Sequence, residues 1–412
     1  MKVSILTLGC KVNQSESTII EGNLIRNGHQ IVSLSEHPDY CVINTCSVTS
    51  KSDYRSRQLI RRAVKSGARV IATGCYAQLR PDEIKKIKGV ECIINNLHKY
   101  NIINVLSNCN ESITFNFSCR SRPYVKVQDG CNFSCSYCII PLARGKSRST
   151  HISDIVQQVN GFESSGYNEI VLTGIHLGLY GYDLKPKTKL SYLIKTLLKE
   201  TKIKRMRLSS IEVREIDSEL IGLLQEQRIC KHIHIPLQSG DDTILKLMNR
   251  KYTTKDYLKV LDNISKKIPN IAIGTDIIVG FPGEGQKEFL NTRNLIESAP
   301  ISYMHIFSFS SRQGTVASQM PVQNSFPVKR ERVNEMKALN IRKKKAYISS
   351  QLNKILDIII EKHNDDKTML GTSGNYLKVR IDSKKYLPKS YVNIRVSGIE
   401  EDILKGYPLE FL

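Results

Sequence analysis

Three cysteines near the end of the first third of the chain are close enough in sequence to hold a metal centre. Cys131, Cys135 and Cys138 form a C-x3-C-x2-C pattern in the segment DGCNFSCSYCIIP. A single zinc ion would need a fourth ligand nearby, and the next candidate, His151, is a weak one. A ferredoxin-type cluster would need a fourth cysteine, which this segment lacks. The pattern therefore favours a [4Fe–4S] cluster with three protein ligands and one iron open to bind another molecule.

Three further cysteines each come directly after a predicted strand. Cys10 follows VSILTLG, Cys46 follows CVINT, and Cys75 follows VIATG. The carboxyl ends of parallel strands line one edge of a sheet, so these residues can converge although they are far apart in sequence. Buried cysteines are also common in protein cores. On the residues alone, a second metal centre and simple core packing both remain open.

Composition limits the class of protein. The chain has 412 residues, eleven cysteines and a net charge of +22. It has no recognisable export signal and no apolar run long enough to cross a bilayer, so we expect a cytoplasmic protein with reduced thiols and no membrane partner. The positive charge makes a polyanion, and nucleic acid first of all, the expected partner. A lysine-rich composition bias is the alternative explanation.

The elements that must position these cysteines indicate an α/β protein in three parts. Residues 1–110 alternate apolar strands with helices and predict a flavodoxin-like open sheet. Residues 117–345 contain six strand–helix units, too few for a closed eightfold barrel, and predict a partial (β/α)6 barrel like that of a TIM barrel. Residues 346–412 change to a period of two and predict a small C-terminal β-barrel with one basic, solvated face.

Small and polar residues occur where successive barrel strands are expected to end. Sites in such barrels are built from these loops, so their joint placement favours a small polar ligand, whereas each alone could be ordinary turn chemistry. The residues singled out are Thr173, Gly174, Ser209, Gln238 and Gly280.

With Tyr137 directly before its last cysteine, the C-x3-C-x2-C segment resembles the signature of the radical S-adenosylmethionine (SAM) superfamily. The resemblance implies that the open iron binds the amino and carboxylate groups of SAM. It also implies that an electron passed through the cluster cleaves SAM to a 5′-deoxyadenosyl radical. Tyr137 and the five strand-end residues are then the candidates for SAM contacts.

The segments TLGCKVNQSES, INTCSVT and TGCYAQ resemble the three cysteine motifs of the methylthiotransferase family. The resemblance covers nearly the whole chain, and residues 346–412 are similar to the TRAM RNA-binding module. It implies that Cys10, Cys46 and Cys75 hold an auxiliary [4Fe–4S] cluster that presents sulfur. One SAM would methylate this sulfur and a second would yield the radical. The implied partners are the anticodon stem-loop of tRNA, a low-potential electron donor and a sulfur donor.

Within that family, LGCKVNQ-ES, GIHLGLYG and HIPLQSGDD are similar to the branch that acts on N6-threonylcarbamoyladenosine at position 37 of tRNA. The branches that act on isopentenyladenosine or on an aspartate of a ribosomal protein are the alternatives, and an RNA-binding protein with structural zinc is a third. The threonyl carboxylate would need a cation, and Arg144 and Arg312 are the predicted partners.

Basic residues cluster in two places that could contact phosphates of the stem-loop. A solvated helix face is the alternative for the first group. The residues are Arg55, Arg57, Arg61, Arg62 and Lys65 on one predicted helix, and Arg144, Lys146 and Arg148 after the cysteine loop.

Overall fold

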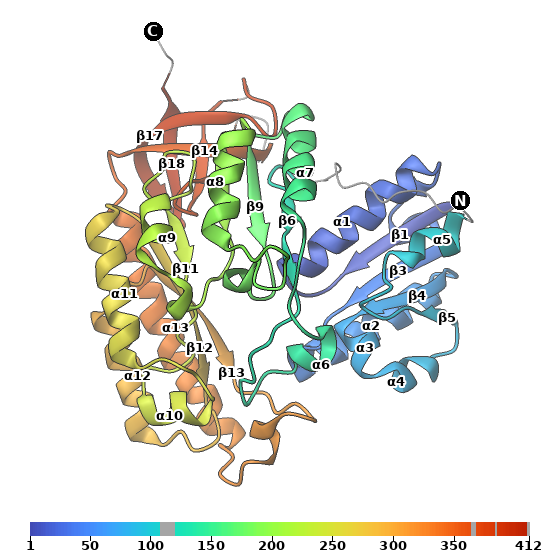
Figure 1. Cartoon of the computed structure of the whole chain (residues 1–412), viewed down its shortest axis with the longest axis horizontal. Coiled ribbons are helices and arrows are strands. Elements are labelled where there is room, and N and C mark those ends of the chain that lie inside the picture. The colour runs from blue at the N-terminus through green and yellow to red at the C-terminus, as the bar shows by residue number, and fades with distance from the viewer. Residues whose placement is uncertain (108–119, 364–367, 384, 410–412) are drawn as a thin grey trace.

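The computed structural model describes residues 1–107, 120–363, 368–383 and 385–409, and Figure 1 shows them as three packed parts. The N-terminal sheet lies beside a larger strand–helix assembly, and a small β-barrel covers one end of that assembly. The structure confirms the predicted mixed α/β class and its three kinds of architecture. The exact divisions after residues 110 and 345 stay predictions. No helix among the described residues is long and apolar enough to cross a membrane.

The N-terminal part is a five-stranded parallel sheet in the order β2-β1-β3-β4-β5. The strand order reverses between β1 and β3, and ligands of open α/β sheets bind at such a point. Its elements are β1 (Lys2–Thr7), α1 (Lys11–Arg26), β2 (Gln30–Ile31), η1 (Leu34–Glu36), β3 (Tyr40–Thr45), α2 (Ser50–Lys65), β4 (Arg69–Gly74), α3 (Cys75–Leu79), α4 (Pro81–Lys85), β5 (Val90–Ile93) and α5 (Asn101–Ser107).

The central part contains the six predicted parallel strands, split into the sheets β10-β9-β6 and β11-β12-β13. Its elements up to the second sheet are β6 (Tyr124–Lys126), β7 (Gln128–Asp129), α6 (Ile140–Arg144), β8 (Arg148–Ser149), α7 (Ile152–Ser164), β9 (Glu169–Thr173), η2 (Leu177–Leu179), α8 (Leu190–Glu200), β10 (Arg205–Leu208), η3 (Val213–Glu215) and α9 (Ser218–Leu223). The remainder are β11 (His232–His234), α10 (Asp242–Leu247), α11 (Thr254–Lys267), β12 (Ala272–Val279), α12 (Gln286–Ser298), β13 (Tyr303–Ser308), η4 (Val316–Gln319) and α13 (Phe326–Ser349).

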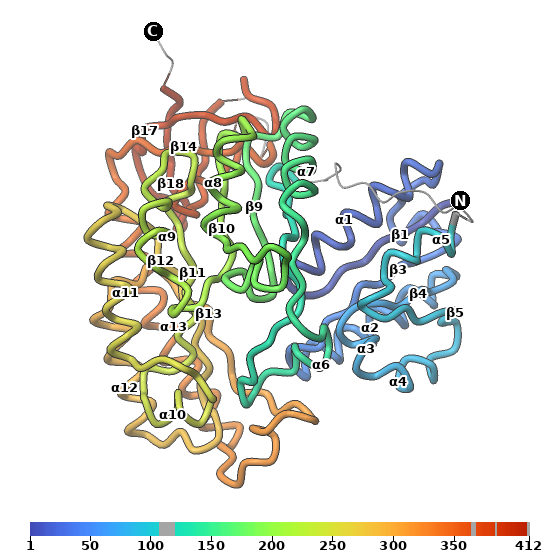
Figure 2. The backbone as a smooth tube through the Cα atoms, viewed as in Figure 1, coloured from blue at the N-terminus to red at the C-terminus, as the bar shows by residue number. Residues whose placement is uncertain are grey.

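The two three-stranded sheets form one open barrel around a shared apolar core. A single bridge between Met206 and Ile229 joins the β10 side to the segment before β11, so the ladder is interrupted there. The helices carry their apolar residues on one face toward the strands, and this core extends across both sheets. Helix α13 packs along β13 at the open edge and leads on to the C-terminal barrel (Figure 2).

The C-terminal part is a closed five-stranded barrel in the order β14-β15-β16-β18-β17. The predicted alternation is confirmed, since Val379, Ile381, Val392, Ile394 and Val396 are all buried in its core. Its elements are β14 (Ile355–His363), β15 (Met369–Ser373), β16 (Lys378–Ile381), β17 (Tyr391–Glu400) and β18 (Ile403–Pro408).

This small barrel is fixed to the amino-terminal ends of β9 and β10 by buried charges. Glu169 is fully buried and accepts hydrogen bonds from Arg205 and from Arg207, the latter at 2.9 Å. Arg205 also pairs with Asp357 at 2.7 Å and donates to the carbonyl of Thr372. The C-terminal barrel is therefore packed against the amino-terminal ends of the central strands, and it forms the floor of the central barrel.

Candidate functional site: two cysteine triads at one domain junction

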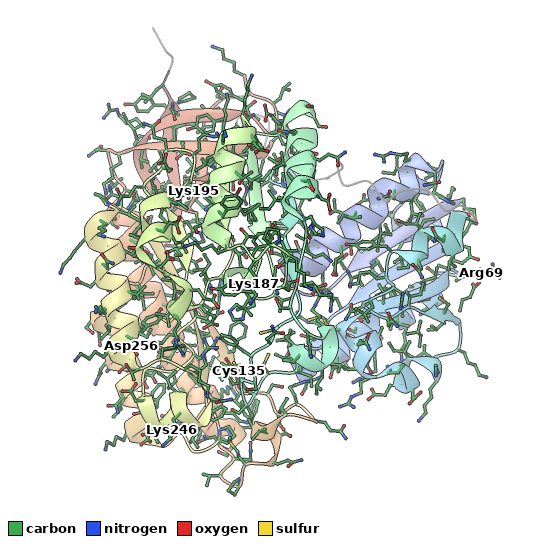
Figure 3. The ribbon with its side chains drawn as sticks, in the orientation of Figure 1. Arg69, Cys135, Lys187, Lys195, Lys246 and Asp256 are labelled. Atoms are coloured by element: carbon green, nitrogen blue, oxygen red, sulfur yellow. The ribbon has the colours of Figure 1, made fainter. Side chains whose placement is uncertain are left out.

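The loop between β7 and α6 folds Cys131, Cys135 and Cys138 around one space. Gly130 has φ +71°, and a Cβ there would lie 2.1 Å from the carbonyl oxygen of Lys146, so the turn before the first cysteine requires glycine. All three cysteines line one cavity of about 600 Å³. Cys135 lies at the junction between the barrel and the N-terminal part, as Figure 3 shows.

Two cationic side chains hold the first two thiols of this loop. The Nδ1 atom of His176 lies 3.3 Å from Cys131 Sγ, and its Nε2 atom contacts Glu215. Burial lowers the pKa of His176, but the hydrogen bonds to Cys131 and Glu215 outweigh it and raise the value to about 9. Arg250 donates to Cys135 Sγ at 3.4 Å. Burial raises the pKa of Cys135, and the Arg250 guanidinium offsets part of this rise by favouring the thiolate, the form that binds iron.

The six predicted SAM-contact residues lie around the same end of the barrel in two groups. Tyr137 and Gln238 line a second cavity together with Cys138. Thr173 and Ser209 end neighbouring strands, and their buried hydroxyl oxygens have no hydrogen-bond partner among the described residues. Free polar atoms of this kind fit a polar ligand.

The two predicted glycines allow close approaches of the backbone. A Cβ at Gly174 would lie 2.9 Å from Gln128 Oε1, and Gly280, with φ +71°, has the side chain of Lys329 where a Cβ would project. That these residues bind SAM stays a prediction.

The other three cysteines meet at the switch point of the N-terminal sheet. Cys10 follows β1, Cys46 follows β3, and Cys75 begins α3 after β4. Gly9 adopts φ +112°, and a Cβ there would lie 3.1 Å from Cys46 Cβ, so glycine lets the first turn approach the second. Burial raises the pKa of Cys75 to about 11 and also raises that of Cys46.

The spacing of sulfurs within each triad suits a cluster better than a single ion. Four sulfurs around one zinc at about 2.3 Å lie within about 3.8 Å of each other. Among the described residues, the only group with three ligand atoms within 4.8 Å of one another is His234, Asp276 and His305. Both cysteine triads are therefore more widely spread than a single ion requires. The residues fit two [4Fe–4S] clusters with three thiolate ligands each.

A buried charge network joins the two triads. Arg144, in the short helix after the Cys131 loop, donates to Glu16 at 3.0 Å, Asp129 at 2.8 Å and Asn13 at 2.8 Å. Asn13 also accepts from Cys10 Sγ at 3.3 Å. Burial alone would raise the pKa of Glu16, but Arg144 and two nearby lysines hold it well below its ordinary value.

The predicted substrate arginines both have carboxylate partners within the chain. Arg144 has no exposed side-chain surface and is paired with Glu16 and Asp129. Arg312 pairs with Asp53 at 2.6 Å and donates to Ser47 at 2.8 Å, which ties the barrel to the loop after Cys46. Each guanidinium would have to exchange partners to bind a substrate carboxylate, so this role stays a prediction.

A cavity of about 220 Å³ lies between Cys138 and the residues that follow Cys46. Val48 and Thr49, just after Cys46, form one wall, and Cys138, Gln238 and Asp276 contribute from the barrel. Its lining combines apolar and polar side chains, as in sites that bind planar organic ligands.

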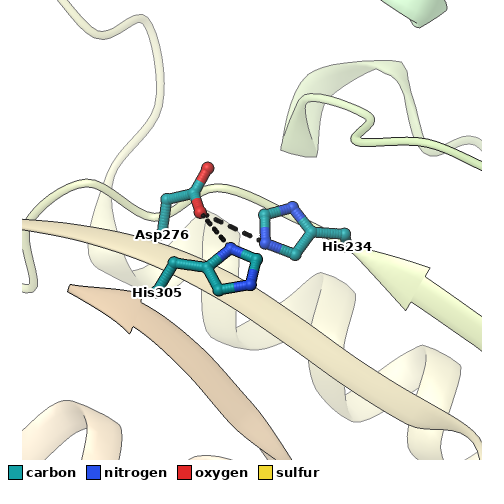
Figure 4. Close-up of side chains that lie close together, drawn as sticks. All are labelled: His234, Asp276 and His305. Atoms are coloured by element: carbon teal, nitrogen blue, oxygen red, sulfur yellow. Dashed lines mark hydrogen bonds and ion pairs between the residues drawn. The ribbon is translucent and has the colours of Figure 1, made fainter. Parts of the chain in front are cut away.

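Asp276 lines this cavity and also belongs to a polar cluster of the barrel. Its Oδ1 atom lies 3.2 Å from His234 Nε2 and 3.1 Å from His305 Nδ1, as Figure 4 shows. Burial raises the pKa of Asp276, but these histidines outweigh burial and hold it far below its ordinary value. Three side chains from neighbouring strands thus form one polar cluster at the edge of the cavity.

Lys11, the first residue of α1, adds a positive charge to this polar region. Its ammonium lies 5.9 Å from the ring centroid of Tyr376, a residue of the C-terminal barrel. The Arg207 guanidinium lies 5.0 Å from the same ring centroid. Burial, reinforced by the charge of Arg207, lowers the pKa of Lys11 to about 8.

Sequence reasoning missed Lys11, Asp276, His305, Arg250 and Glu215 as site residues. Each is a single charged or polar residue without a recognisable spacing, unlike the cysteines. One signal was present for Asp276, because a carboxylate within the apolar strand AIGTDIIV must either be paired or face a cavity.

Two family models match the chain. The Radical SAM superfamily matches residues 125–296, and a family described as uncharacterized protein family UPF0004 matches residues 2–95. The first match runs from β6 into α12 and includes the Cys131 loop, and the second covers the N-terminal sheet with the other triad.

Curated relatives match over almost the full length. The chain is 36% identical to threonylcarbamoyladenosine tRNA methylthiotransferase MtaB of Aquifex aeolicus, with 97% of this chain and 98% of the relative covered. It is 37% identical to the protein of the same name from Bacillus subtilis, with 98% and 94% covered. A tRNA-2-methylthio-N(6)-dimethylallyladenosine synthase of Acetivibrio thermocellus is 30% identical, with 97% and 89% covered.

Among solved structures, the fold is similar to that of TsrM, a radical SAM methyltransferase from Kitasatospora setae with cobalamin and a [4Fe–4S] cluster bound. The TM-score is 0.57 and the identity 12%, with 77% of each chain covered. This similarity concerns the fold.

Proposed function

The chain belongs to the methylthiotransferase family of radical SAM enzymes, and we propose that it inserts a methylthio group at C2 of N6-threonylcarbamoyladenosine 37 in tRNA. The observation that carries this proposal is the meeting of two cysteine triads at one domain junction, with a cavity between them. The names of the full-length relatives at 36–37% identity support the threonylcarbamoyl substrate over the isopentenyl one.

The six cysteines of the site form two groups, one for each proposed cluster. Cys131, Cys135 and Cys138 would hold one [4Fe–4S] cluster with SAM, and Cys10, Cys46 and Cys75 would hold the other. When bound, these groups supply a 5′-deoxyadenosyl radical and a sulfur atom, a chemistry suited to an aromatic C–H bond that acid–base catalysis cannot break.

The protein's own side chains orient and shield the reactants. His176 and Arg250 fix Cys131 and Cys135 by hydrogen bonds, and Asn13 does the same for Cys10. The cavity lined by Tyr137 and Gln238, two of the predicted SAM contacts, would exclude water from the reacting groups. Because Arg144 and Arg312 tie the two parts together, the distance between the centres is fixed before substrate binds.

The proposed partners are the anticodon stem-loop of tRNA, a low-potential electron donor and a sulfur donor, and the proposed location is the cytoplasm. Exposed basic side chains on α2 support a contact with RNA phosphates, since Arg55, Arg61, Arg62 and Lys65 all face solvent on the helix that follows Cys46.

The test is turnover by the anaerobically reconstituted enzyme with SAM and a reductant. We expect tRNA carrying threonylcarbamoyladenosine to gain a methylthio group, detected by mass spectrometry of its nucleosides, and the Cys131→Ala variant to give none. Product from isopentenyladenosine tRNA alone, or from a ribosomal protein alone, would overturn the substrate assignment.

A further inference from the structure

Lys11 differs from the other cations around the polar region of the barrel because it has no anionic partner. Arg207 is paired with Glu169, and Arg122 with Glu361 at 2.6 Å. Lys11 makes no ion pair with any carboxylate of the described residues, and its ammonium lies beside the Tyr376 ring. Its side chain is only partly exposed, so little water compensates for the missing anion.

The nearest carboxylates are already committed to other groups. Glu169 accepts from two arginines, and Asp276 accepts from His305 and lies 3.2 Å from His234. Both act on Lys11 only through longer-range charge interactions. The place beside Lys11 therefore carries uncompensated positive charge, while the matching negative charge is absent from the described part of the chain.

The position of Lys11 relates it to both the sulfur centre and the cavity. It follows Cys10 directly, and its ammonium lies 5.9 Å from the centroid of the Tyr376 ring. From Tyr376, aromatic contacts run through Tyr303 to His305, which is hydrogen-bonded to Asp276 at the edge of the cavity. A nucleobase whose C2 atom faces the auxiliary centre has its N6 substituent further along the same ring. Lys11, one residue from Cys10, is therefore a candidate to meet that substituent.

We propose that Lys11 binds the carboxylate of the threonylcarbamoyl side chain and so selects this substrate over nucleosides with an apolar N6 group. This inference rests on the proposed function and names the residue that carries its specificity. An isopentenyl group in the same place would leave the ammonium partly desolvated and unpaired, which disfavours the wrong substrate as well as stabilising the right one.

The aromatic rings beside Lys11 suit the same ligand. Tyr376 and Tyr303 lie with ring centroids 6.1 Å apart, and His232 stacks near both. Tyr376 comes from the C-terminal barrel. The part of the chain that is expected to bind RNA therefore also lines the proposed site of the threonylcarbamoyl group. Flat apolar surfaces next to one cation match the methyl, carbamoyl and carboxylate groups of a threonylcarbamoyl substituent.

The experiment compares two tRNAs that differ only in charge at this group. One carries threonylcarbamoyladenosine 37, and the other carries the same nucleoside with its threonyl carboxylate converted to the primary amide. Wild type, Lys11→Met and Lys11→Arg are assayed for methylthio product. Lys88→Met serves as the matched control because Lys88 is exposed at the far side of the N-terminal sheet.

We expect Lys11→Met to lower kcat/KM on the carboxylate tRNA by about 100-fold and to leave the already slow turnover of the amide tRNA unchanged. Lys11→Arg should recover most of the loss, since it keeps the charge, and Lys88→Met should behave as wild type. Equal losses on both tRNAs would show a structural role and overturn the proposal, as would full activity of Lys11→Met on the carboxylate tRNA.

Binding of the two tRNAs, measured without reductant, keeps the proposal testable if a variant loses turnover. Wild type should bind the carboxylate tRNA more tightly than the amide tRNA, and Lys11→Met should bind both alike. An unchanged preference in Lys11→Met would overturn the proposal. Failure of the proposed function has a different signature, because wild type itself would then give no methylthio product on threonylcarbamoyladenosine tRNA.

Discussion

Arg144 donates to Glu16 at 3.0 Å although the two residues are 128 positions apart in the sequence. One follows the Cys131 loop of the barrel, and the other lies on the helix that begins beside Cys10. Both side chains are fully buried. The two cysteine triads are therefore joined by a charged contact that water does not reach, which makes their relative position a property of the fold.

The first prediction concerns this contact. Glu16→Gln leaves Arg144, Lys99 and Lys126 without their shared anion, and we expect the free energy of unfolding to fall by about 3–5 kcal/mol. Urea unfolding of the anaerobic protein, followed by circular dichroism, measures the change. The control is Glu331→Gln, whose side chain is exposed on α13. Equal stability of the two variants would contradict the importance assigned to this network.

The second prediction separates the two metal centres. Wild type should contain about eight irons per chain after anaerobic reconstitution, and Cys10→Ala and Cys131→Ala should each contain about four. Cys131→Ala should abolish SAM cleavage, whereas Cys10→Ala should retain SAM cleavage and lose methylthio transfer. The control is Cys92→Ala, because Cys92 lies in strand β5 away from both triads. Methylthio product from Cys10→Ala would show that the first triad is assigned wrongly.

The third prediction is a pH dependence at the floor of the barrel. Burial raises the pKa of Glu169, but Arg205, Arg207 and Arg122 outweigh it and lower the value from 4.5 to about 2. The lowered pKa stabilises the fold by about 3 kcal/mol above pH 4.5, and this contribution is lost as the pH falls from about 4.5 to 2.

Glu169→Gln provides the measurement for that prediction. The difference in unfolding free energy between wild type and variant should be constant from pH 7 to pH 5.5 and should shrink below pH 4.5. A difference that does not change with acid would mean that the glutamate is not held ionised by its arginines.

The fourth prediction concerns tRNA affinity. Binding should weaken steeply with salt, because each lysine or arginine contact to phosphate releases counterions. Exposed Arg55 and Arg62 on α2 are the residues to change. Replacing both with Gln should weaken binding and reduce the slope of log K against log salt by roughly 1–2. Filter binding at several salt concentrations measures this, and an unchanged slope would place the phosphate contacts elsewhere.

The six barrel strands and the Cys131 triad could be predicted from the sequence because each has a local signal, whereas grouping Cys10, Cys46 and Cys75 as cluster ligands depended on the family resemblance. Apolar runs mark the strands, and strand ends place Cys10, Cys46 and Cys75 at one edge. The interruption between β10 and β11 could not be predicted, since periodicity identifies strands and does not specify how they pair. The same applies to the carboxylate partners of Arg144 and Arg312, which are distant in sequence.

The docking of the C-terminal barrel was also missed, although the strand RMRL contained a hint. Two arginines in a strand buried on both faces must be paired, and here Arg205 and Arg207 pair with Glu169 and reach the turn before Tyr376. Lys11 had no such signal, because one lysine after a cysteine looks like any helix start.

The fixed floor of the barrel affects how this protein can change during evolution. A small RNA-binding module is usually portable, since it can be lost, duplicated or exchanged at a linker. Here the module supplies Tyr376 beside Lys11, and its backbone carbonyls accept hydrogen bonds from Arg205 and Arg207. Its replacement by an unrelated module would remove the Tyr376 ring from beside Lys11 and leave Arg205 and Arg207 without these carbonyl acceptors. The three parts of the chain are therefore expected to be inherited as one unit.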